Sequence, residues 1–356
     1  MAESRLPTGP RNLEEFLDYP RRTIRALCRD AGQRERLAKH FARGITLSSD
    51  YSGIMSFEDS MLYHAAALVK LGICRDADVH IYKVCDVDAT CRRVMASRQS
   101  GQPAVMLADL QARLPTWALE RIQDLEPPDS ETRMAVREHQ YDKMLQFLLD
   151  NRSTLFNVNA MSSAIDMSNP GKDMEPSMYN FVRSPEQQSP PTERPRRLQG
   201  HGSGSICVAW TPRGLRARGG HFSNKLLNIW LAERVALAES AVEDLLFHEC
   251  SHHFPKAKLD VLNTTHTVLS TIASPQNLGH PTSRRRRLSF AFNKATMCWV
   301  GPSDFDTDYR RQLYCDPGVI SADYLMIDGA GIRLEAASLA KAKTKHTCMQ
   351  QCSRMH

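Results

Sequence analysis

Apolar and polar positions in the first third of the chain alternate in blocks of two kinds. Residues 45–50 form a short β-prone run that ends in a turn of small residues, and residues 57–71 then have the spacing of an amphipathic helix. The same succession continues with a strand-like run over residues 79–84, a helix over residues 88–95 and a third strand over residues 104–108. Strands that alternate with helices predict an α/β fold with a doubly wound, mostly parallel sheet.

The segments on either side of this block are predicted to be helical. Before it, residues 13–41 have helical spacing that is broken at Pro20 and at Ala31-Gly32, which predicts two short helices. After it, residues 131–150 predict one amphipathic helix. Its apolar side carries Met134, Tyr141, Met144, Leu145 and Leu148.

The sheet is completed only in the second half of the chain. Residues 163–203 are rich in proline, serine, glutamine and charge, and they are predicted to form a flexible insertion. Beyond them the pattern predicts a helix over residues 225–242 and strands over residues 205–209, 245–248, 267–273 and 287–293. We therefore predict a helical segment at 1–43, a sheet domain at 44–301 with a helical and flexible insertion at about 125–203, and a further region or tail at 302–356.

Composition adds a location and a class of partner to this picture. The chain of 356 residues has no apolar run of the roughly eighteen residues that span a bilayer, and its first thirty residues lack an apolar leader, so an intracellular protein is expected. Ten cysteines without a C-x-x-C pair are expected to be reduced thiols. The net charge of +6 is concentrated in short blocks such as residues 284–287 and 341–345, which permits a polyanionic partner.

Three successive predicted strands end in residues suited to a nucleotide-like cofactor. The turn Asp50-Tyr-Ser-Gly-Ile54 offers backbone amides ahead of a helix N-terminus. The second strand ends in Cys85-Asp-Val-Asp88, where a carboxylate could accept both hydroxyls of a ribose, although Asp88 is expected to cap the next helix. Asp109, just past the third strand, could bond an adenine amine or cap a turn. Their order describes the cofactor edge of an open α/β sheet.

The fourth and fifth predicted strands bring two further groups to the same edge. Cys207 is expected at the carboxyl end of the fourth strand, where a thiolate would face the cofactor, and a buried structural cysteine is the alternative. Glu249 follows an apolar run at the end of the fifth strand, where a carboxylate is rarely placed without a partner.

The residues around Glu249 also satisfy the zinc-peptidase pattern H-E-x-x-H. On a helix, His248 and His252 would bind zinc, Glu249 would activate water, and His266 or His280 could supply a third ligand. The strand-like run before His248 and a proline soon after His252 disfavour such a helix, so a zinc peptidase is a minor alternative.

Taken in order, these segments resemble the motifs of the DNA cytosine-5 methyltransferases over roughly residues 44–301. The segments that carry the resemblance are Tyr51-Ser-Gly-Ile, Cys85-Asp-Val-Asp, Asp109-Leu110, Ser205-Ile-Cys-Val-Ala-Trp, His248-Glu-Cys-Ser-His-His-Phe254 and Gly279-His-Pro-Thr-Ser-Arg-Arg-Arg286. The resemblance implies a Rossmann-like methyltransferase fold, S-adenosyl-L-methionine as cofactor, and methylation of cytosine carbon 5 in DNA, or in RNA, in the nucleus.

In that family a cysteine thiolate attacks carbon 6 of a flipped-out cytosine and a glutamate supports ring nitrogen 3, which makes carbon 5 nucleophilic. The resemblance gives these roles to Cys207 and Glu249, and the holding of the extruded base and nearby phosphate to Arg284 and Arg286. It also implies cofactor contacts from Tyr51, Ser52, Gly53, Asp86 at the ribose, Val87 over the adenine, Asp109 at the adenine amine, and Leu110.

The chain departs from the family pattern at several of these positions. Met55-Ser56 stands where the family has two glycines in the cofactor turn, Ile206 where a proline precedes the nucleophile, and Thr282 where the base-holding segment has a glutamine. A catalytically silent relative that binds nucleic acid is therefore the main alternative.

Overall fold

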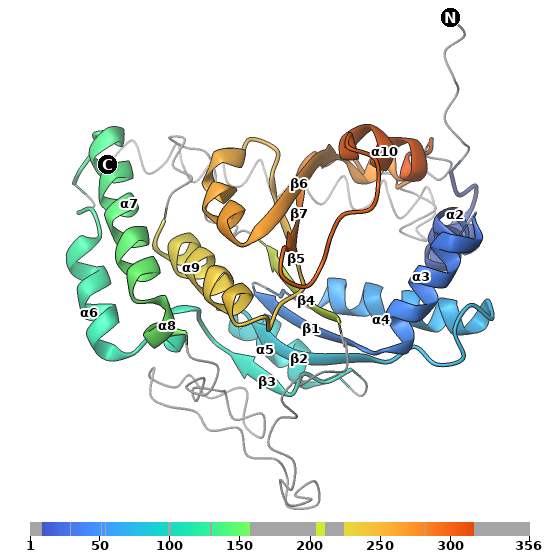
Figure 1. Cartoon of the computed structure of the whole chain (residues 1–356), viewed down its shortest axis with the longest axis horizontal. Helices are drawn as coiled ribbons and strands as arrows, with labels where there is room; N and C mark the ends of the chain where they lie inside the picture. Colours follow the sequence, from blue (N-terminus) through green and yellow to red (C-terminus); the bar gives the residue numbers. More distant parts are fainter. Residues whose placement is uncertain are drawn as a thin grey trace, which may run out of the picture. The chain divides into compact units, whose positions relative to one another are not determined.

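The computed structural model describes residues 9–28, 30–50, 52–53, 55–98, 101–128, 130–156, 204–210, 224–280 and 282–316 (Figure 1). Within residues 204–210, and at positions 13, 16 and 112, only the backbone is described. The chain divides into two compact units, one of residues 20–272 and 286–309, the other of residues 1–19, 273–285 and 310–356. The predicted flexible insertion at 163–203 lies outside the described residues, and the predicted domain boundaries stay a prediction.

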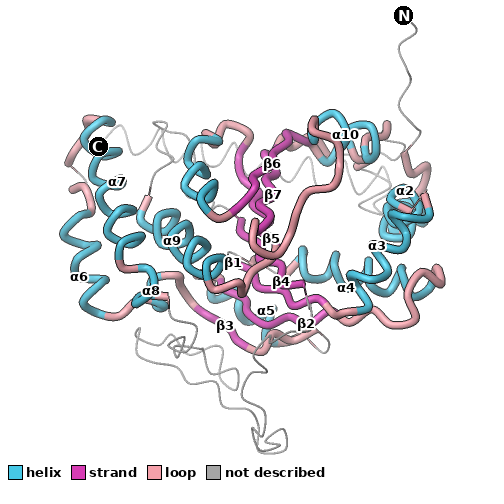
Figure 2. The backbone as a smooth tube through the Cα atoms, in the orientation of Figure 1, coloured by secondary structure: helices cyan, strands magenta, loops and turns pink. Residues whose placement is uncertain are grey.

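The first unit is built around a seven-stranded sheet with the order β3-β2-β1-β4-β5-β7-β6, drawn in magenta in Figure 2. The strands are β1 Ile45–Asp50, β2 Val79–Cys85, β3 Val105–Leu107, β4 Gly204–Trp210, β5 Leu245–Ser251, β6 His266–Ala273 and β7 Arg286–Asn293. β1 to β5 pair in parallel, whereas β7 runs antiparallel to β5. The predicted α/β fold with a mostly parallel sheet is confirmed.

Helices cover both faces of this sheet, as a doubly wound fold requires. The helices of the described residues are α1 Leu13–Leu17, α2 Tyr19–Leu27, α3 Ala31–Ala42, α4 Ser56–Lys70, α5 Ala89–Ala96, α6 Thr116–Leu125, α7 Met134–Asp150, α8 Arg152–Leu155, α9 Lys225–Glu239 and α10 Phe305–Leu313, of which α1 belongs to the second unit and α10 is divided between the two. Successive residues of β5 show the two faces, because Leu246 belongs to a buried cluster with α7 and α9, whereas Phe247 packs against a second cluster that contains α4.

The N-terminal region contains three helices where the sequence predicts two. Asp30 caps α3, because its carboxylate accepts a hydrogen bond from Gln33 N–H at 2.7 Å, and the helix begins at Ala31, where a break was expected. Pro20 does not break α2, because it lies in the first turn, where a proline N–H is not needed. The predicted helix over residues 131–150 is observed as α7, with Tyr141 and Met144 buried.

Helix α9 is the most deeply buried element of the first unit. Asn224 caps it by accepting a hydrogen bond from Leu227 N–H at 2.7 Å, and residues 227–238 are all buried. A helix that is buried on every side is expected to be apolar throughout, yet α9 contains Glu233 and Arg234. These two charges therefore need partners inside the protein.

The second unit is held by backbone contacts between distant segments. Leu278 and Cys315 form an isolated β-bridge, and Gly9 N–H donates to the carbonyl of Asp316 at 2.8 Å. A Cβ at Gly9 would lie 2.0 Å from that carbonyl oxygen, so this approach requires glycine. In neither unit is a described helix both long and apolar enough to cross a membrane.

Candidate functional site

The turn after β1 is hydrogen bonded to the end of β2. Ser52 N–H donates to the carbonyl of Cys85 at 2.9 Å, and Cys85 N–H donates back to Oγ of Ser52 at 3.1 Å. Gly53 N–H donates to Oδ2 of Asp86 at 2.7 Å. Three predicted cofactor residues, Ser52, Gly53 and Asp86, thus lie together, whereas the predicted Tyr51 lies outside the described residues.

Asp86 is held by backbone groups on several sides. Besides the bond from Gly53, Oδ1 of Asp86 accepts a hydrogen bond from Asp88 N–H at 2.9 Å. The backbone N–H of Asp86 donates to the carbonyl of Leu107 at 3.2 Å. A carboxylate offers about four lone-pair sites, and the backbone uses two of them here. Two lone-pair sites remain, and they match in number the two hydroxyl donors of a ribose diol.

The two residues after Asp86 differ in their setting: Val87 is exposed at the surface, and Asp88 caps a helix. Val87 is 71% exposed, which is unusual for an apolar side chain and is compatible with covering a planar ring. Asp88 caps α5, because its carboxylate accepts a hydrogen bond from Thr90 N–H at 2.7 Å. The predicted N-cap role of Asp88 is confirmed.

Asp109 and Leu110 follow β3, and their side chains have different surroundings. The carboxylate of Asp109 accepts hydrogen bonds from the backbone N–H and from Nε2 of Gln111, both at 3.0 Å, so it closes the turn that leads into the short 3-10 helix η1 (Gln111–Arg113). Of its two predicted roles, the turn cap is the one observed. Leu110 is 1% exposed and packs in the core, which contradicts a cofactor contact by its side chain.

Met55 stands where the resembled family has glycine, and its backbone has the left-handed conformation that glycine favours. Its φ of 68° and ψ of 34° are left-handed, and its side chain is fully buried. The turn before α4 therefore keeps a glycine-type conformation despite the methionine, which fills a site in the core.

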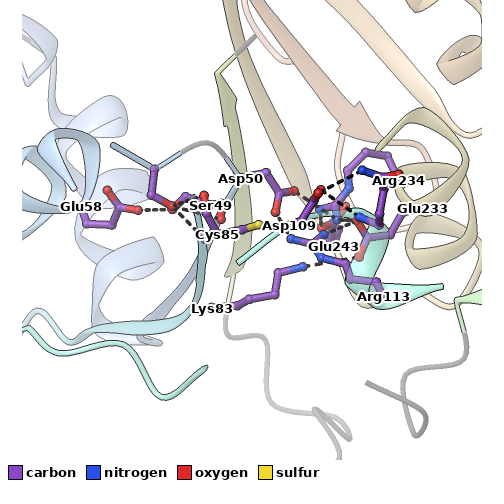
Figure 3. Close-up of polar contacts among 12 residues, drawn as sticks. Ser49, Asp50, Glu58, Lys83, Cys85, Asp109, Arg113, Glu233, Arg234 and Glu243 are labelled. Carbon is purple, nitrogen blue, oxygen red and sulfur yellow. Dashed lines mark hydrogen bonds and ion pairs between the residues drawn. The ribbon is translucent and has the colours of Figure 1, made fainter. Parts of the chain in front are cut away.

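A chain of buried hydroxyls supports the same turn. Oγ of Ser52 lies 2.5 Å from Oγ of Ser49, which in turn hydrogen bonds to the carboxylate of Glu58 in the first turn of α4 (Figure 3). Burial raises the pKa of Glu58, which is 1% exposed. The sequence gives no signal for this contact, because an acidic residue in the first turn of a helix is ordinary.

Six charged side chains form a buried network between the end of β1 and α9 (Figure 3). The three acids and three bases are Asp50, Glu233, Glu243, Lys83, Arg113 and Arg234, each 9% exposed or less. With all six groups ionised, the three negative and three positive charges balance. Sequence reasoning missed all of these pairings.

The contacts of this network join four parts of the fold. Arg113, at the end of η1, contacts Asp50 at the end of β1 and lies 2.5 Å from Oε2 of Glu233. Arg234 lies 2.5 Å from the same Glu233 oxygen, and it contacts Glu243 in the loop before β5. Burial opposes the ionisation of Asp50, but Arg113 and the other bases outweigh it and lower its pKa. Burial raises the pKa of Glu243 to about 7.

Glu249, the predicted support of ring nitrogen 3, and Arg286, a predicted base-holding residue, meet across β5 and β7. Arg286 is in register with Ser251, and it reaches diagonally to donate from Nε to Oε1 of Glu249 at 3.0 Å. The side chain of Arg286 is 24% exposed and that of Glu249 is 13% exposed. Arg284 lies in the second unit, where its N–H donates to Oγ of Ser274 at 2.9 Å.

Cys207 lies inside β4 and not at its carboxyl end. The strand continues to Trp210, and Cys207 is in register with Ser48 and Leu246, whereas Trp210 is in register with Glu249. At about 3.3 Å per residue, the backbone of Cys207 lies about 10 Å short of the level of Glu249. The predicted strand-end position is wrong, because Cys207 is the fourth of the seven residues of β4.

The zinc-peptidase alternative is contradicted by the conformation of its motif. His248 and Glu249 are consecutive residues of β5 and so point to opposite faces of the sheet. The ring of His248 is buried and stacked on Trp230 with centroids 5.2 Å apart, and burial lowers its pKa to about 4. His248 and His252 therefore do not lie one helical turn apart, as that motif requires.

Comparison with known proteins gives only distant likenesses. No family model matches the chain, and no curated protein is similar to it. One similar solved structure is described as a DNA modification methyltransferase encoded within an E. coli prophage, with 10% identity over 70% of this chain and 47% of that one and a TM-score of 0.32.

Two further similar structures are Dnmt2 proteins. A Spodoptera frugiperda DNMT2 mutant has 11% identity over 73% of this chain and 54% of its own, with a TM-score of 0.32. S. pombe Dnmt2 methyltransferase has 11% identity over 76% of this chain and 54% of its own, with a TM-score of 0.31. The chain spans about half the length of all three structures. The functional assignment rests on the contacts described above.

Proposed function

We propose that this chain is an S-adenosyl-L-methionine-dependent methyltransferase that acts on carbon 5 of cytosine in nucleic acid. One support is the sheet order, in which β7 is inserted antiparallel between β5 and β6. A dinucleotide-binding fold would instead place six parallel strands in the order 3-2-1-4-5-6. The antiparallel β7 therefore distinguishes this sheet from the dinucleotide-binding fold.

The observation that carries the proposal is the setting of Asp86. Hydrogen bonds from Gly53 and Asp88 fix its carboxylate at the carboxyl end of β2 and leave two lone-pair sites for hydroxyl donors. The exposed Val87 beside it would cover the adenine ring. These residues fit the nucleoside half of the cofactor, which supplies an electrophilic methyl group when bound.

The remaining residues would act on the base. Glu249, oriented by Nε of Arg286, would hold a proton at ring nitrogen 3 of the extruded cytosine. The thiolate of Cys207 would form a bond to carbon 6, which makes carbon 5 nucleophilic towards the methyl group that the cofactor supplies. Once carbon 5 carries that methyl group, removal of its proton would break the bond to Cys207. Arg284, in the second unit, would bind a phosphate of the nucleic acid. DNA is the proposed substrate, and the nucleus is the proposed location.

A second candidate function follows from the register of β4. Cys207 lies about three residues short of the level of Glu249, so both groups could reach one base only if the end of β4 unpaired. A catalytically silent relative that binds nucleic acid needs no such rearrangement. It would use the same fold and the basic residues without forming a covalent bond.

A trapping experiment separates these two candidates. The purified chain is incubated with S-adenosyl-L-methionine and duplex DNA that contains 5-fluorocytosine, which blocks removal of the group at carbon 5 and so retains the bond to the enzyme. We expect a denaturation-resistant adduct that Cys207→Ser abolishes and that Cys298→Ser, the change at an exposed thiol, leaves intact. No adduct, together with salt-sensitive DNA binding, would support the silent relative.

A further inference from the structure

The guanidinium of Arg92 closes over the backbone of the loop that carries Asp86 and Val87. Arg92 lies in the first turn of α5, and its Nη1 donates to the carbonyl of Asp86 at 2.9 Å and to the carbonyl of Val87 at 2.7 Å. A cation in the first turn of a helix is disfavoured by the helix dipole. The hydrogen bonds to the carbonyls of Asp86 and Val87 offset this unfavourable interaction. Asp86 and Val87 are also the two residues assigned to the nucleoside.

With these bonds, every polar atom of Asp86 has one hydrogen-bond partner, and each carboxylate oxygen keeps one further lone-pair site. Its N–H donates to Leu107, its two carboxylate oxygens accept from Gly53 and Asp88, and its carbonyl accepts from Arg92. Only the bonds from Arg92 come from a side chain, so they can be removed without changing the backbone. Arg92 also restrains Val87, whose exposed side chain has few other contacts to hold it.

We infer that Arg92 is a positioning residue that sets affinity for the nucleoside half of the cofactor by fixing the Asp86–Val87 loop. The inference rests on the proposed function, because it assumes that this loop binds a nucleoside. A loop ordered before binding loses less conformational entropy when the ligand arrives. Arg92 should therefore affect every ligand that contains the adenosine moiety, whether or not the amino-acid part is present.

The test is calorimetric titration with two probes, S-adenosylhomocysteine and 5′-methylthioadenosine, which lacks the amino-acid part. Arg92→Gln is expected to weaken both by the same factor, roughly tenfold, since bonds from a charged donor are stronger than neutral ones. Arg92→Lys should restore part of the affinity. Arg93→Gln is the matched control, because Arg93 is exposed on the same helix and donates to the side chain of Thr90 at 3.3 Å.

The outcomes distinguish this inference from the function on which it rests. A wild-type chain that binds neither probe would overturn the proposed function and this inference with it. A wild-type chain that binds both, with Arg92→Gln binding them equally well, would overturn the inference alone. So would a loss confined to S-adenosylhomocysteine, because it would place Arg92 against the amino-acid part. A purely structural role would lower the unfolding temperature of Arg92→Gln and leave both affinities unchanged.

Discussion

Arg113 and Asp50 form an ion pair in which both side chains are buried, 2% and 0% exposed. The pair joins the turn after β3 to the end of β1, directly before the proposed cofactor turn. Removing one partner of a buried pair leaves the other charge without compensation, so Arg113→Met should lower the free energy of unfolding by about 3–5 kcal/mol. Urea denaturation of the purified chain measures this loss.

A partly exposed ion pair provides the control for that loss. Arg152 and Glu239 are 34% and 42% exposed, and Glu239→Gln should cost less than about 1 kcal/mol because solvent screens the pair. Equal costs for Arg113→Met and Glu239→Gln would mean that the network is not buried as described.

Glu243 makes stability depend on pH near neutrality. Burial raises its pKa from 4.5 to about 7 in the folded chain, so the folded state favours the protonated carboxyl. The resulting stabilisation is complete below pH 4.5 and is lost as the pH rises to about 7. Glu243→Gln keeps a neutral side chain, and it should therefore gain stability relative to the wild type over this range, by up to about 3 kcal/mol. Parallel denaturation curves at pH 5 and pH 8 measure the difference, and a constant difference would contradict the assignment.

Met55 combines a left-handed backbone with a fully buried side chain, and the two effects can be separated. Both Met55→Ala and Met55→Gly should destabilise the chain by roughly 2–5 kcal/mol through the cavity they leave. Only glycine relieves the backbone, so Met55→Gly should be the more stable variant by about 1 kcal/mol. At Met95, equally buried but within α5, the order should reverse because glycine weakens a helix by about 1 kcal/mol. The same order at both positions would argue against the left-handed turn.

Ala241 offers a site where one substitution should stabilise the chain. It follows α9 with a φ of 51°, and its N–H and that of Val242 donate to the carbonyls of Ala238 and Leu237, both at 3.0 Å. This is the hydrogen-bond pattern of a helix end that favours glycine. Ala241→Gly should raise the free energy of unfolding by about 1 kcal/mol. Ala66→Gly, on the exposed side of α4, should lower it by a similar amount.

Local signals predicted much of the fold. Periodicity located β1, α4 and β2, and the cap signal at Asp88 placed the start of α5. Asp86 was assigned to the ribose through the family resemblance and its place after a predicted strand, and that assignment stays a prediction. Glu249 and Arg286 were each predicted, but their pairing depends on the antiparallel register of β5 and β7, which the pattern alone does not specify.

The buried charges could not have been predicted in the same way. Asp50 and Arg113 are 63 residues apart, and Arg113 and Glu233 are 120 residues apart. Charged residues usually lie at the surface, so Glu233 and Arg234 have the composition of a solvated helix face. The position of Cys207 was mispredicted for a different reason: the pattern placed the strand at residues 205–209, close to the observed β4, but Cys207 lies in the middle of that run and was assigned to its end.

Calorimetric titration with S-adenosylhomocysteine tests the central claim most directly. The wild-type chain should bind it at micromolar concentration, and Asp86→Asn should weaken binding at least tenfold by removing one carboxylate acceptor from the ribose site. Asp88→Asn is the control, because asparagine also caps a helix and should bind like the wild type. The absence of binding by a folded wild-type chain, or equal binding by Asp86→Asn, would contradict the account.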